Sequence, residues 1–407
     1  MNLLQIVALV AGVTALAAGI GLSILLLGLQ RVFASAPTLW QQNDEPITDT
    51  SLTVVIPAFN EANNIEGCLT HVLMSDKPCS QWEVFVVDDQ SSDNTVKIAE
   101  QTIGIVAGAD QPSAAVLQAG PRPKGERWVG KNWGCSQAME QIRSEWVLFI
   151  DADVTLAPDA IRRALQQSIN EKADLFSLAP RLTCGCLAEW MVQPIMASLL
   201  GLGFPILEAN DPASTVAFAA GPFMLFRRDS YNTIGGHRAL AGEVVEDLAL
   251  ARRIKEGGFR LRYVLGIDAV NLQMYANLEA LWEGWSKNWF LGLDRSISKS
   301  LGAGGVVLLM FTLPWLLLPT SLTMAFLSNQ DQILWLCDAG LAFIAILMQL
   351  GVRLWTRTRF SVPLRHWWLM GIGGVIIGLI APTSVWKSLT GRGWTWKGRS
   401  LAEAHEL

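Results

Sequence analysis

The sequence predicts an α/β domain with a mainly parallel sheet, attached to membrane-spanning helices at both ends of the chain. Two observations support this prediction. Residues 51–180 alternate short apolar runs with longer amphipathic stretches, and four apolar segments of about 20 residues lie before and after the central region. The composition agrees, because 51% of the 407 residues are hydrophobic and 17 are tryptophan, which is more apolar than an ordinary soluble enzyme.

The four segments long and apolar enough to cross a bilayer are residues 3–29, 303–326, 333–352 and 367–386. The first has no basic region before it and no small-residue cleavage site, so we expect a retained anchor. Arginines follow the first and third segments, whereas the loop 328–332 carries no basic residue. The positive-inside rule then places the central domain on the cytosolic side of the cell inner membrane.

The fourth segment conflicts with this orientation, because by spanning it would carry the basic tail to the opposite side. Its glycines and Pro382 could break the helix and let it re-enter, so both arrangements stay open. The predicted organisation is an anchor at 1–30, a linker at 31–50, a cytosolic domain at 51–295, a membrane region at 300–390 and a basic interfacial tail at 391–407.

The net charge and the spacing of the cysteines and histidines argue against several classes of protein. The net charge of −5 argues against a nucleic-acid-binding protein, which normally has a basic face. Six cysteines include no Cys-x-x-Cys pair, so we expect free thiols in a reducing compartment. The four histidines have no partner at metal-ligand spacing, and we expect His237 in a surface loop.

Three of the four predicted strands, at residues 52–56, 84–87, 115–117 and 147–150, end in polar residues. The ends are Pro57 to Asn60, Asp88-Asp89 and Asp151-Ala-Asp153. Because ligands bind at the carboxyl ends of parallel strands, we expect these three ends to meet at one crevice.

The pair Asp151 and Asp153 is the most informative of these strand ends. Carboxylates repel phosphates unless a cation lies between them. The pair therefore predicts Mg²⁺ or Mn²⁺, joining Asp153, with help from Asp151, to the diphosphate of a nucleotide-activated donor. An incidental acidic turn is the alternative, because Asp commonly ends strands.

Six motifs occur in order between about residues 50 and 290: Val54-Val-Ile-Pro-Ala-Phe-Asn60-Glu61, Val86-Val-Asp88-Asp89-Gln-Ser-Ser-Asp93-Asn-Thr95, Gly130-Lys131-Asn132-Trp133, Phe149-Ile-Asp151-Ala-Asp153, Gly221-Pro222 and Val245-Glu246-Asp247-Leu248. Together they resemble the family 2 inverting glycosyltransferases of the GT-A fold, which has a Rossmann-like sheet. The membrane-anchored layout and the tail Gly391-Arg-Gly-Trp-Thr-Trp-Lys-Gly-Arg399 resemble the branch of ceramide glucosyltransferase-like, hopanoid-associated and carotenoid glycosyltransferases.

The resemblance implies a donor site at the strand ends. Asp89 would accept a hydrogen bond from the nucleotide base, with Asp88 beside it, and a carboxylate suits the imide N–H of uracil. Lys131 would lie near the diphosphate, although an exposed loop lysine is the alternative. The first strand end would frame the base pocket with Pro57, Asn60 and Glu61.

The resemblance also implies an acceptor side with a catalytic base. Direct displacement at the anomeric carbon needs a carboxylate to take the proton of the acceptor hydroxyl, and we choose Asp247. Glu246 and Asp247 open a helical pattern, where the helix dipole stabilises the charged form. Acidic residues are also common in ordinary first turns. Gly221 and Glu246 are expected beside this base.

The stretch Trp285-Ser-Lys-Asn-Trp289 departs from the Gln-x-x-Arg-Trp motif of processive family members and keeps only its tryptophan. This weakens any prediction of polymer synthesis. Trp282, Trp285 and Trp289 would share one helix face, either as packing residues or as an aromatic platform on the acceptor side. The apolar segment 187–206, broken by Pro194 and Pro205, predicts either a core helix pair or a helix in the membrane interface.

The sequence therefore predicts a membrane-bound, metal-dependent enzyme that moves one sugar, with inversion, from a nucleotide sugar, favouring UDP, to a lipid-like hydroxyl. Carotenoid, hopanoid, sphingolipid and glycerolipid acceptors remain open, and membrane lipids are the expected surroundings. The alternatives are a processive polysaccharide synthase, a polyprenyl-phosphate glycosyltransferase, and a non-catalytic nucleotide-sugar-binding scaffold.

Overall fold

The computed structural model describes residues 3–41, 47–106, 108, 111–328, 330–360 and 362–401, which form two compact units. The sheet unit comprises Ser35–Thr183 and Phe204–Met274. The helical unit comprises Met1–Ala34, Cys184–Gly203 and Tyr275–Leu407. Residues 184–203 and 275–295, which we expected in the cytosolic domain, thus group with the membrane-type helices.

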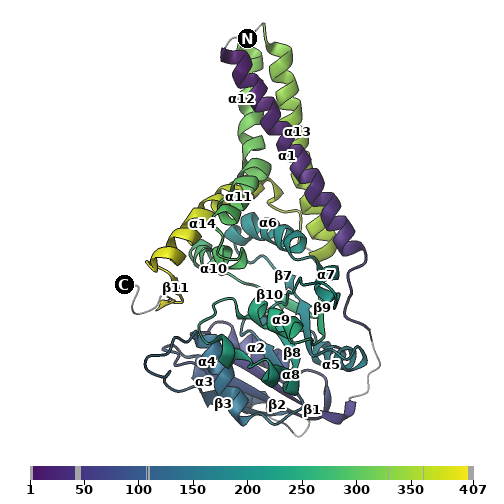
Figure 1. The fold of residues 1–407 in the computed structure, drawn as a ribbon, viewed down its shortest axis with the longest axis vertical. Coiled ribbons are helices and arrows are strands. Elements are labelled where there is room, and N and C mark those ends of the chain that lie inside the picture. The colour runs from purple at the N-terminus through teal and green to yellow at the C-terminus, as the bar shows by residue number, and fades with distance from the viewer. Residues whose placement is uncertain are drawn as a thin grey trace. The chain divides into compact units, whose positions relative to one another are not determined.

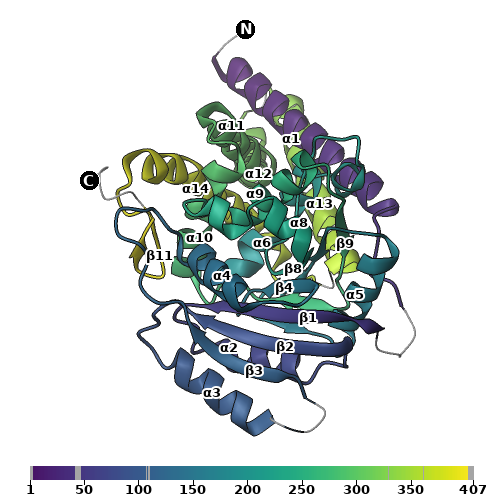
Figure 2. The same ribbon diagram turned by 60° about the horizontal axis from the view of Figure 1, so that its bottom comes forward.

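A seven-stranded sheet with the order β3-β2-β1-β4-β8-β6-β9 forms the centre of the sheet unit (Figure 2). The four predicted strands are present and somewhat longer than their apolar runs. β1, β2, β3 and β4 run parallel, β6 and β9 are parallel to each other, and β8 is antiparallel to both neighbours. The bounds are β1 Ile47–Ala58, β2 Cys79–Asp88, β3 Ser113–Gln118, β4 Trp146–Ile150, β6 Leu175–Ala179, β8 Phe223–Arg227 and β9 Leu261–Leu265.

Helices cover both faces of this sheet, because successive strand residues point to opposite faces. In β1, Val54 and Ile56 lie in one hydrophobic cluster with residues of α2, α3 and α5, whereas Val55 lies in another with residues of α4, α8 and α9. The helices are α2 Ile65–Leu73, α3 Thr95–Val106, α4 Gly130–Gln141, α5 Ala160–Asn170, α7 Ile206–Asn210, α8 Arg228–Thr233 and α9 Glu246–Glu256, with a 3-10 turn at His237–Leu240. The result is the predicted α/β layered arrangement.

A small second sheet has the strand order β5-β10-β7, and β5 begins directly after the acidic turn that follows β4. Its strands are β5 Val154–Leu156, β7 Arg181–Leu182 and β10 Val270–Leu272. Because β5 begins directly after Asp153, its pairing with β10 fixes the chain immediately after the two strand-end carboxylates.

Among the residues that the structure describes, four helical stretches of the helical unit are long and apolar enough to cross a membrane: Leu3–Ala34, Ile297–Leu327, Gln332–Phe360 and Trp367–Thr390. They coincide with the four predicted segments and extend each of them. Their elements are α1 Leu3–Ala34, α11 Ile297–Val307, a π-helical turn at Leu308–Thr312, α12 Leu313–Leu327, α13 Gln332–Phe360, a 3-10 turn at Trp367–Leu369 and α14 Met370–Thr390. Figure 1 shows α1, α12 and α13 running together. Many apolar side chains of these helices are exposed.

The fourth segment is one continuous helix, α14, across Pro382, whereas a re-entrant arrangement would be expected to break there. Its interruption lies earlier, at the 3-10 turn that begins at Trp367. The segment expected at 187–206 forms α6 Leu187–Gly203, a single helix through Pro194, which packs against α1, α10, α13 and α14. The unit also contains α10 Leu278–Gly292 and a C-terminal hairpin of β11 Thr395–Trp396 and β12 Arg399–Ser400.

Candidate active site

The strand topology brings the predicted polar ends to one edge of the sheet. β1 pairs in parallel with both β2 and β4, so the residues that follow these three strands leave the sheet on the same side. The antiparallel β8 adds a fourth contribution. Phe223, the first residue of β8, pairs with Ile150, the last residue of β4, and therefore Gly221 lies at the same edge as Asp151.

The end of β1 is tied to the loop after β2 by a set of short polar contacts. Asn60 adopts a positive φ of 53°, and its Oδ1 accepts from the Ser92 N–H at 2.9 Å. The Glu61 N–H donates to Thr95 Oγ1 at 2.8 Å. Asp88 is buried and accepts from the Ser91 N–H at 3.2 Å, so it shapes the turn after the strand. Pro57, which precedes this region, pairs with Val87 in the parallel ladder.

Asp89, the predicted base-recognising carboxylate, forms an ion pair with Arg122, whose Nη2 lies 2.5 Å from Asp89 Oδ2. Arg122 Nη1 also donates to the carbonyl of Trp128 at 3.3 Å. Gly130 approaches this pair closely, since a Cβ at Gly130 would lie 2.3 Å from Asp89 Oδ2. Our sequence analysis missed Arg122. The available signal was its position in a Gly-Pro-Arg-Pro turn shortly after the third predicted strand.

Lys131, in the first turn of α4, connects the two sides of the site. Its Nζ lies 2.6 Å from Asp151 Oδ1 and 2.6 Å from Glu246 Oε1. Burial acts to lower the pKa of Lys131, but the two carboxylates outweigh it and hold the pKa well above its ordinary value. Burial likewise acts to raise the pKa of Glu246, yet the Lys131 ammonium holds it below its ordinary value. Lys131 and Glu246 are therefore both charged at neutral pH.

The carboxylates of Asp151 and Asp153 fit a hard divalent cation by the chemistry of their oxygen donors. Asp151 shares one oxygen with Lys131, which leaves its other carboxylate oxygen outside this ion pair. Within the described ranges no group of three or more His, Cys, Asp or Glu side chains is placed to hold an ion. A cation here would thus take most of its ligands from phosphate and water, which is common for Mg²⁺.

Asp247 lies in the first turn of α9, where two backbone N–H groups reach its carboxylate. The Gly221 N–H donates to Oδ2 at 3.1 Å, and the Leu248 N–H donates to Oδ1 at 2.7 Å. Burial, followed by the negative charge of Glu246, raises the pKa of Asp247 to about 6. A carboxylate with this pKa is ionised at pH 7 and holds a proton more tightly than an exposed aspartate, which suits a general base.

Gly221 allows this close approach. A Cβ at this position would lie 3.0 Å from Asp247 Oδ2 and 3.4 Å from its Cβ, which is tighter than an ordinary van der Waals contact. The residue that the sequence placed on the acceptor side therefore contacts the proposed base directly.

The prediction that His237 lies in a surface loop is wrong. Its side chain is 1% exposed, and its Nδ1 shares a hydrogen bond of 2.7 Å with the Tyr231 hydroxyl. Burial lowers the pKa of His237 to about 3, so the imidazole is neutral. Gly236, at φ 49°, leaves room for the Tyr231 ring, which a Cβ there would overlap. Gly236 thus allows the turn that brings His237 onto the buried Tyr231 ring.

Trp285 and Trp289 lie on α10 in the helical unit, and both are buried there. Trp285 Nε1 donates to Gln193 Oε1 of α6 at 3.3 Å, and Trp289 Nε1 donates to the Ser300 carbonyl of α11 at 3.2 Å. Both indoles therefore pack between helices of their own unit, which is the packing role that we considered for them.

The sheet unit has the GT-A fold, a mainly parallel sheet with helices on both faces. A mannosyltransferase from Pyrobaculum calidifontis, solved with GDP-Man and Mn²⁺, shares this fold with a TM-score of 0.51 at 15% identity, covering 93% of this chain and 99% of its own.

Residues 53–235 match the family model described as Glycosyl transferase family 2. Two curated relatives, both named 4,4'-diaponeurosporenoate glycosyltransferase, come from the Staphylococcus aureus strains bovine RF122 / ET3-1 and USA300. They are 26% identical over 268 and 264 residues. Each alignment covers 64% of this chain and 66% of the relative, so the chain spans slightly less than two thirds of their length.

Proposed function

We propose that this protein is a membrane-bound inverting glycosyltransferase that transfers one sugar from a nucleotide sugar to a lipid-like acceptor. The observation that carries the proposal is Asp247, an ionised carboxylate of raised pKa at the start of α9. It lies next to Glu246, which Lys131 joins to Asp151 at the donor edge of the sheet. A protein that only bound a nucleotide sugar would not need this base.

The chemistry follows from the placement of these groups. Asp247 takes the proton of the acceptor hydroxyl while the hydroxyl oxygen attacks the anomeric carbon. The new carbon–oxygen bond forms on the face opposite the breaking bond to the diphosphate, so the configuration inverts. Lys131 offsets negative charge beside the diphosphate. A Mg²⁺ or Mn²⁺ ion, held chiefly by Asp153 with Asp151, would stabilise the departing nucleoside diphosphate.

Asp89 and Arg122 are proposed to read the nucleotide base. The carboxylate accepts a hydrogen bond and the guanidinium donates one, which together suit the imide N–H and carbonyl of uracil. This pairing supports a UDP-sugar as the donor.

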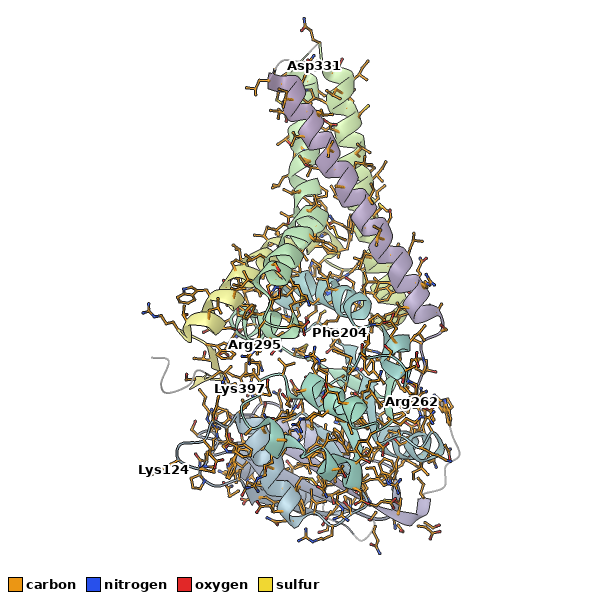
Figure 3. The ribbon with its side chains drawn as sticks, in the orientation of Figure 1. Lys124, Phe204, Arg262, Arg295, Asp331 and Lys397 are labelled. Carbon is orange, nitrogen blue, oxygen red and sulfur yellow. The ribbon has the colours of Figure 1, made fainter. Side chains whose placement is uncertain are left out.

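The acceptor is proposed to be a lipid-like molecule, because the relatives are named for a carotenoid acid and four helical stretches are apolar enough to cross a membrane. Arg31 of α1 and Arg357 and Arg359 of α13 lie in the last turns of their helices. At the opposite end, Gln5 Nε2 donates to Asp331 Oδ1 at 3.0 Å, and Figure 3 shows Asp331 there. The positive-inside rule supports a cytosolic position for the arginine end, in the cell inner membrane.

The test is release of nucleoside diphosphate by the full-length protein in detergent. UDP and GDP sugars are compared with and without Mn²⁺ or Mg²⁺, and with a total lipid extract added. We expect metal-dependent release that the extract stimulates, with a glycosylated lipid visible by mass spectrometry. Asp247→Asn should abolish release, whereas Asp229→Asn, at an exposed position of α8, should not. Donor binding without turnover on any extract would contradict the proposal and favour a binding scaffold.

The relatives' name supports a second candidate for the accepting group, because it is the name of a carboxylate. An acceptor carboxylate is already ionised at neutral pH and needs no base to remove a proton. Retention of more than about one tenth of the activity in Asp247→Asn would favour this glycosyl-ester chemistry, since general bases typically contribute about 10²–10⁴-fold.

A further inference from the structure

The connecting segment, residues 208–221, leads from α7 to β8 and ends in the candidate active site. Its residues 211–221 lie in neither helix nor strand, and all of them are described. Without a backbone ladder, the conformation of such a segment depends on its contacts with neighbouring elements. Its last residue, Gly221, donates a hydrogen bond to Asp247 Oδ2. The contacts that hold the segment therefore bear on the proposed base.

Lys255 makes an unusual set of contacts with this segment. Its Nζ donates to the backbone carbonyls of Glu208, Asp211, Ser214 and Val216, at 3.1, 2.9, 3.0 and 2.6 Å. An ammonium has only three N–H bonds, so four carbonyls at these distances offer an acceptor to each of them. Four carbonyl oxygens at hydrogen-bond distance offset the free-energy cost of partly burying the Lys255 charge. One side chain thus contacts four points along residues 208–216, from the end of α7 into the irregular chain that follows.

Lys255 and Asp247 lie on the same helix. They are eight residues apart in α9, which separates them by about 12 Å along the helix axis. The connecting segment is therefore attached to α9 at both ends, by Lys255 near its start and by Asp247 at Gly221. Ser177 adds support beside Gly221, because its Oγ accepts from the Ala220 N–H at 2.8 Å.

Asn210 fixes the beginning of the segment to β9. Its Nδ2 donates to the carbonyl of Tyr263 at 2.7 Å, and its Oδ1 accepts from the Tyr263 N–H at 2.9 Å. Phe218, further along, packs edge to face against the Tyr263 ring at 5.1 Å. Both contacts hold the segment next to β9, but neither involves residues 211–216. Among Asn210, Phe218 and Lys255, only Lys255 contacts that stretch.

We propose that Lys255 is a positioning residue for the transfer reaction, holding the connecting segment on α9 so that the Gly221 N–H stays on the Asp247 carboxylate. The proposal rests on the assignment of Asp247 as the base. Loss of the Lys255 contacts frees residues 211–216, and the Gly221 hydrogen bond then forms for only part of the time. Asp247 keeps the Leu248 N–H but loses the donor that orients its second oxygen.

Loss of the Gly221 hydrogen bond changes the pKa of Asp247 in one definite direction. A hydrogen bond to the charged form of a carboxyl lowers its pKa, so weakening the bond from Gly221 raises the pKa of Asp247 further. The other ionisable groups that act on Asp247 or are acted on by it are Glu246, Lys131 and Tyr263, and Lys255→Met replaces none of them. The acidic limb of the pH profile therefore reports on this one hydrogen bond.

The first test is hydrogen exchange of the full-length protein in detergent, which needs no substrate. Lys255→Met removes the ammonium and keeps an apolar side chain of similar length. We expect exchange at residues 211–221 to accelerate about tenfold or more. The matched control is Lys97→Met, at an exposed position of α3, which should leave this exchange unchanged. Equal exchange in the two variants would overturn the proposal, whether or not the protein transfers sugars.

The second test is kinetic and separates positioning from simple loss of folded protein. In Lys255→Met we expect kcat to fall about tenfold, the donor KM to stay within about twofold, and the acidic limb of kcat to move to higher pH. Lys255→Arg, which keeps the cation, should restore much of kcat. A uniform loss of activity at every pH, with an unmoved limb, would mean a structural role only and would refute positioning.

Discussion

The substitution Glu246→Gln tests whether the negative charge of Glu246 helps to set the pKa of Asp247. Glu246 is the second-largest cause, after burial, of the raised pKa of Asp247, which is about 6. Two charges about 6–7 Å apart at an effective dielectric constant of about 20 interact by roughly 2.5 kcal/mol, or nearly 2 pKa units. Asp247 is partly exposed, so solvent screens this interaction, and we expect the pKa of Asp247 to fall by about 1 unit.

The loss of Glu246 also leaves Lys131 with one carboxylate partner fewer, which acts in the same direction because Lys131 lowers the pKa of Asp247. As a base, Asp247 must be deprotonated. At pH 5 a pKa of about 6 leaves roughly one tenth of the sites ionised, whereas a pKa of about 5 leaves roughly one half. The activity at pH 5, relative to that at pH 7.5, should therefore increase about fivefold in the variant.

The assay is nucleoside diphosphate release across pH 4.5–8 at saturating donor and acceptor, with each profile normalised to its plateau. Glu256→Gln, the same change at the exposed end of α9, is the control and should leave the limb in place. An unmoved limb, or a limb moved to higher pH, would refute the electrostatic assignment of Asp247.

Four further outcomes are expected. Asp247→Asn should lower turnover by about 10²–10⁴-fold and raise the free energy of unfolding at pH 7 by about 1–3 kcal/mol. The raised pKa of Asp247 destabilises the folded protein increasingly as pH rises from about 4 to 6. At pH 4, urea unfolding should therefore show little gain in stability from Asp247→Asn. Lys131→Met should destabilise the protein by about 2–3 kcal/mol, less than a fully buried pair, because Asp151 is 30% exposed. Gly221→Ala should reduce kcat about tenfold with an unchanged donor KM, since its Cβ would press on Asp247. Chelation of divalent ions should abolish turnover, and added Mn²⁺ should restore it.

The sequence predicted the first four strands well because each is a short apolar run followed by a polar turn, and both signals are local. The parallel arrangement then followed from the alternation of strands and helices, and it correctly implied that the ends of β1, β2 and β4 share an edge. The antiparallel β8 was not predicted, because strand direction depends on long-range pairing and not on local composition.

The sequence predicted which residues form the candidate site, but not which of their side chains contact one another. Lys131 was expected near phosphate, and its bridge between Asp151 and Glu246 joins residues 20 and 115 positions away in the chain. Lys255 had no local signal, because a lysine in the last turn of a helix is ordinary, and the only signal for Arg122 was its Gly-Pro-Arg-Pro turn. His237 was misplaced since its burial depends on a turn that folds it back onto Tyr231.

The reversed direction of β8 divides the sheet into blocks that the chain builds one after the other. Strands β1 to β4 come from residues 47–150, whereas Gly221, Asp247, β8 and β9 come from residues 204–274. Such a division suits recombination between relatives. A chimera that exchanges residues 204–274 should change the acceptor while keeping the sugar donor, provided that the graft retains Glu246 as the partner of Lys131.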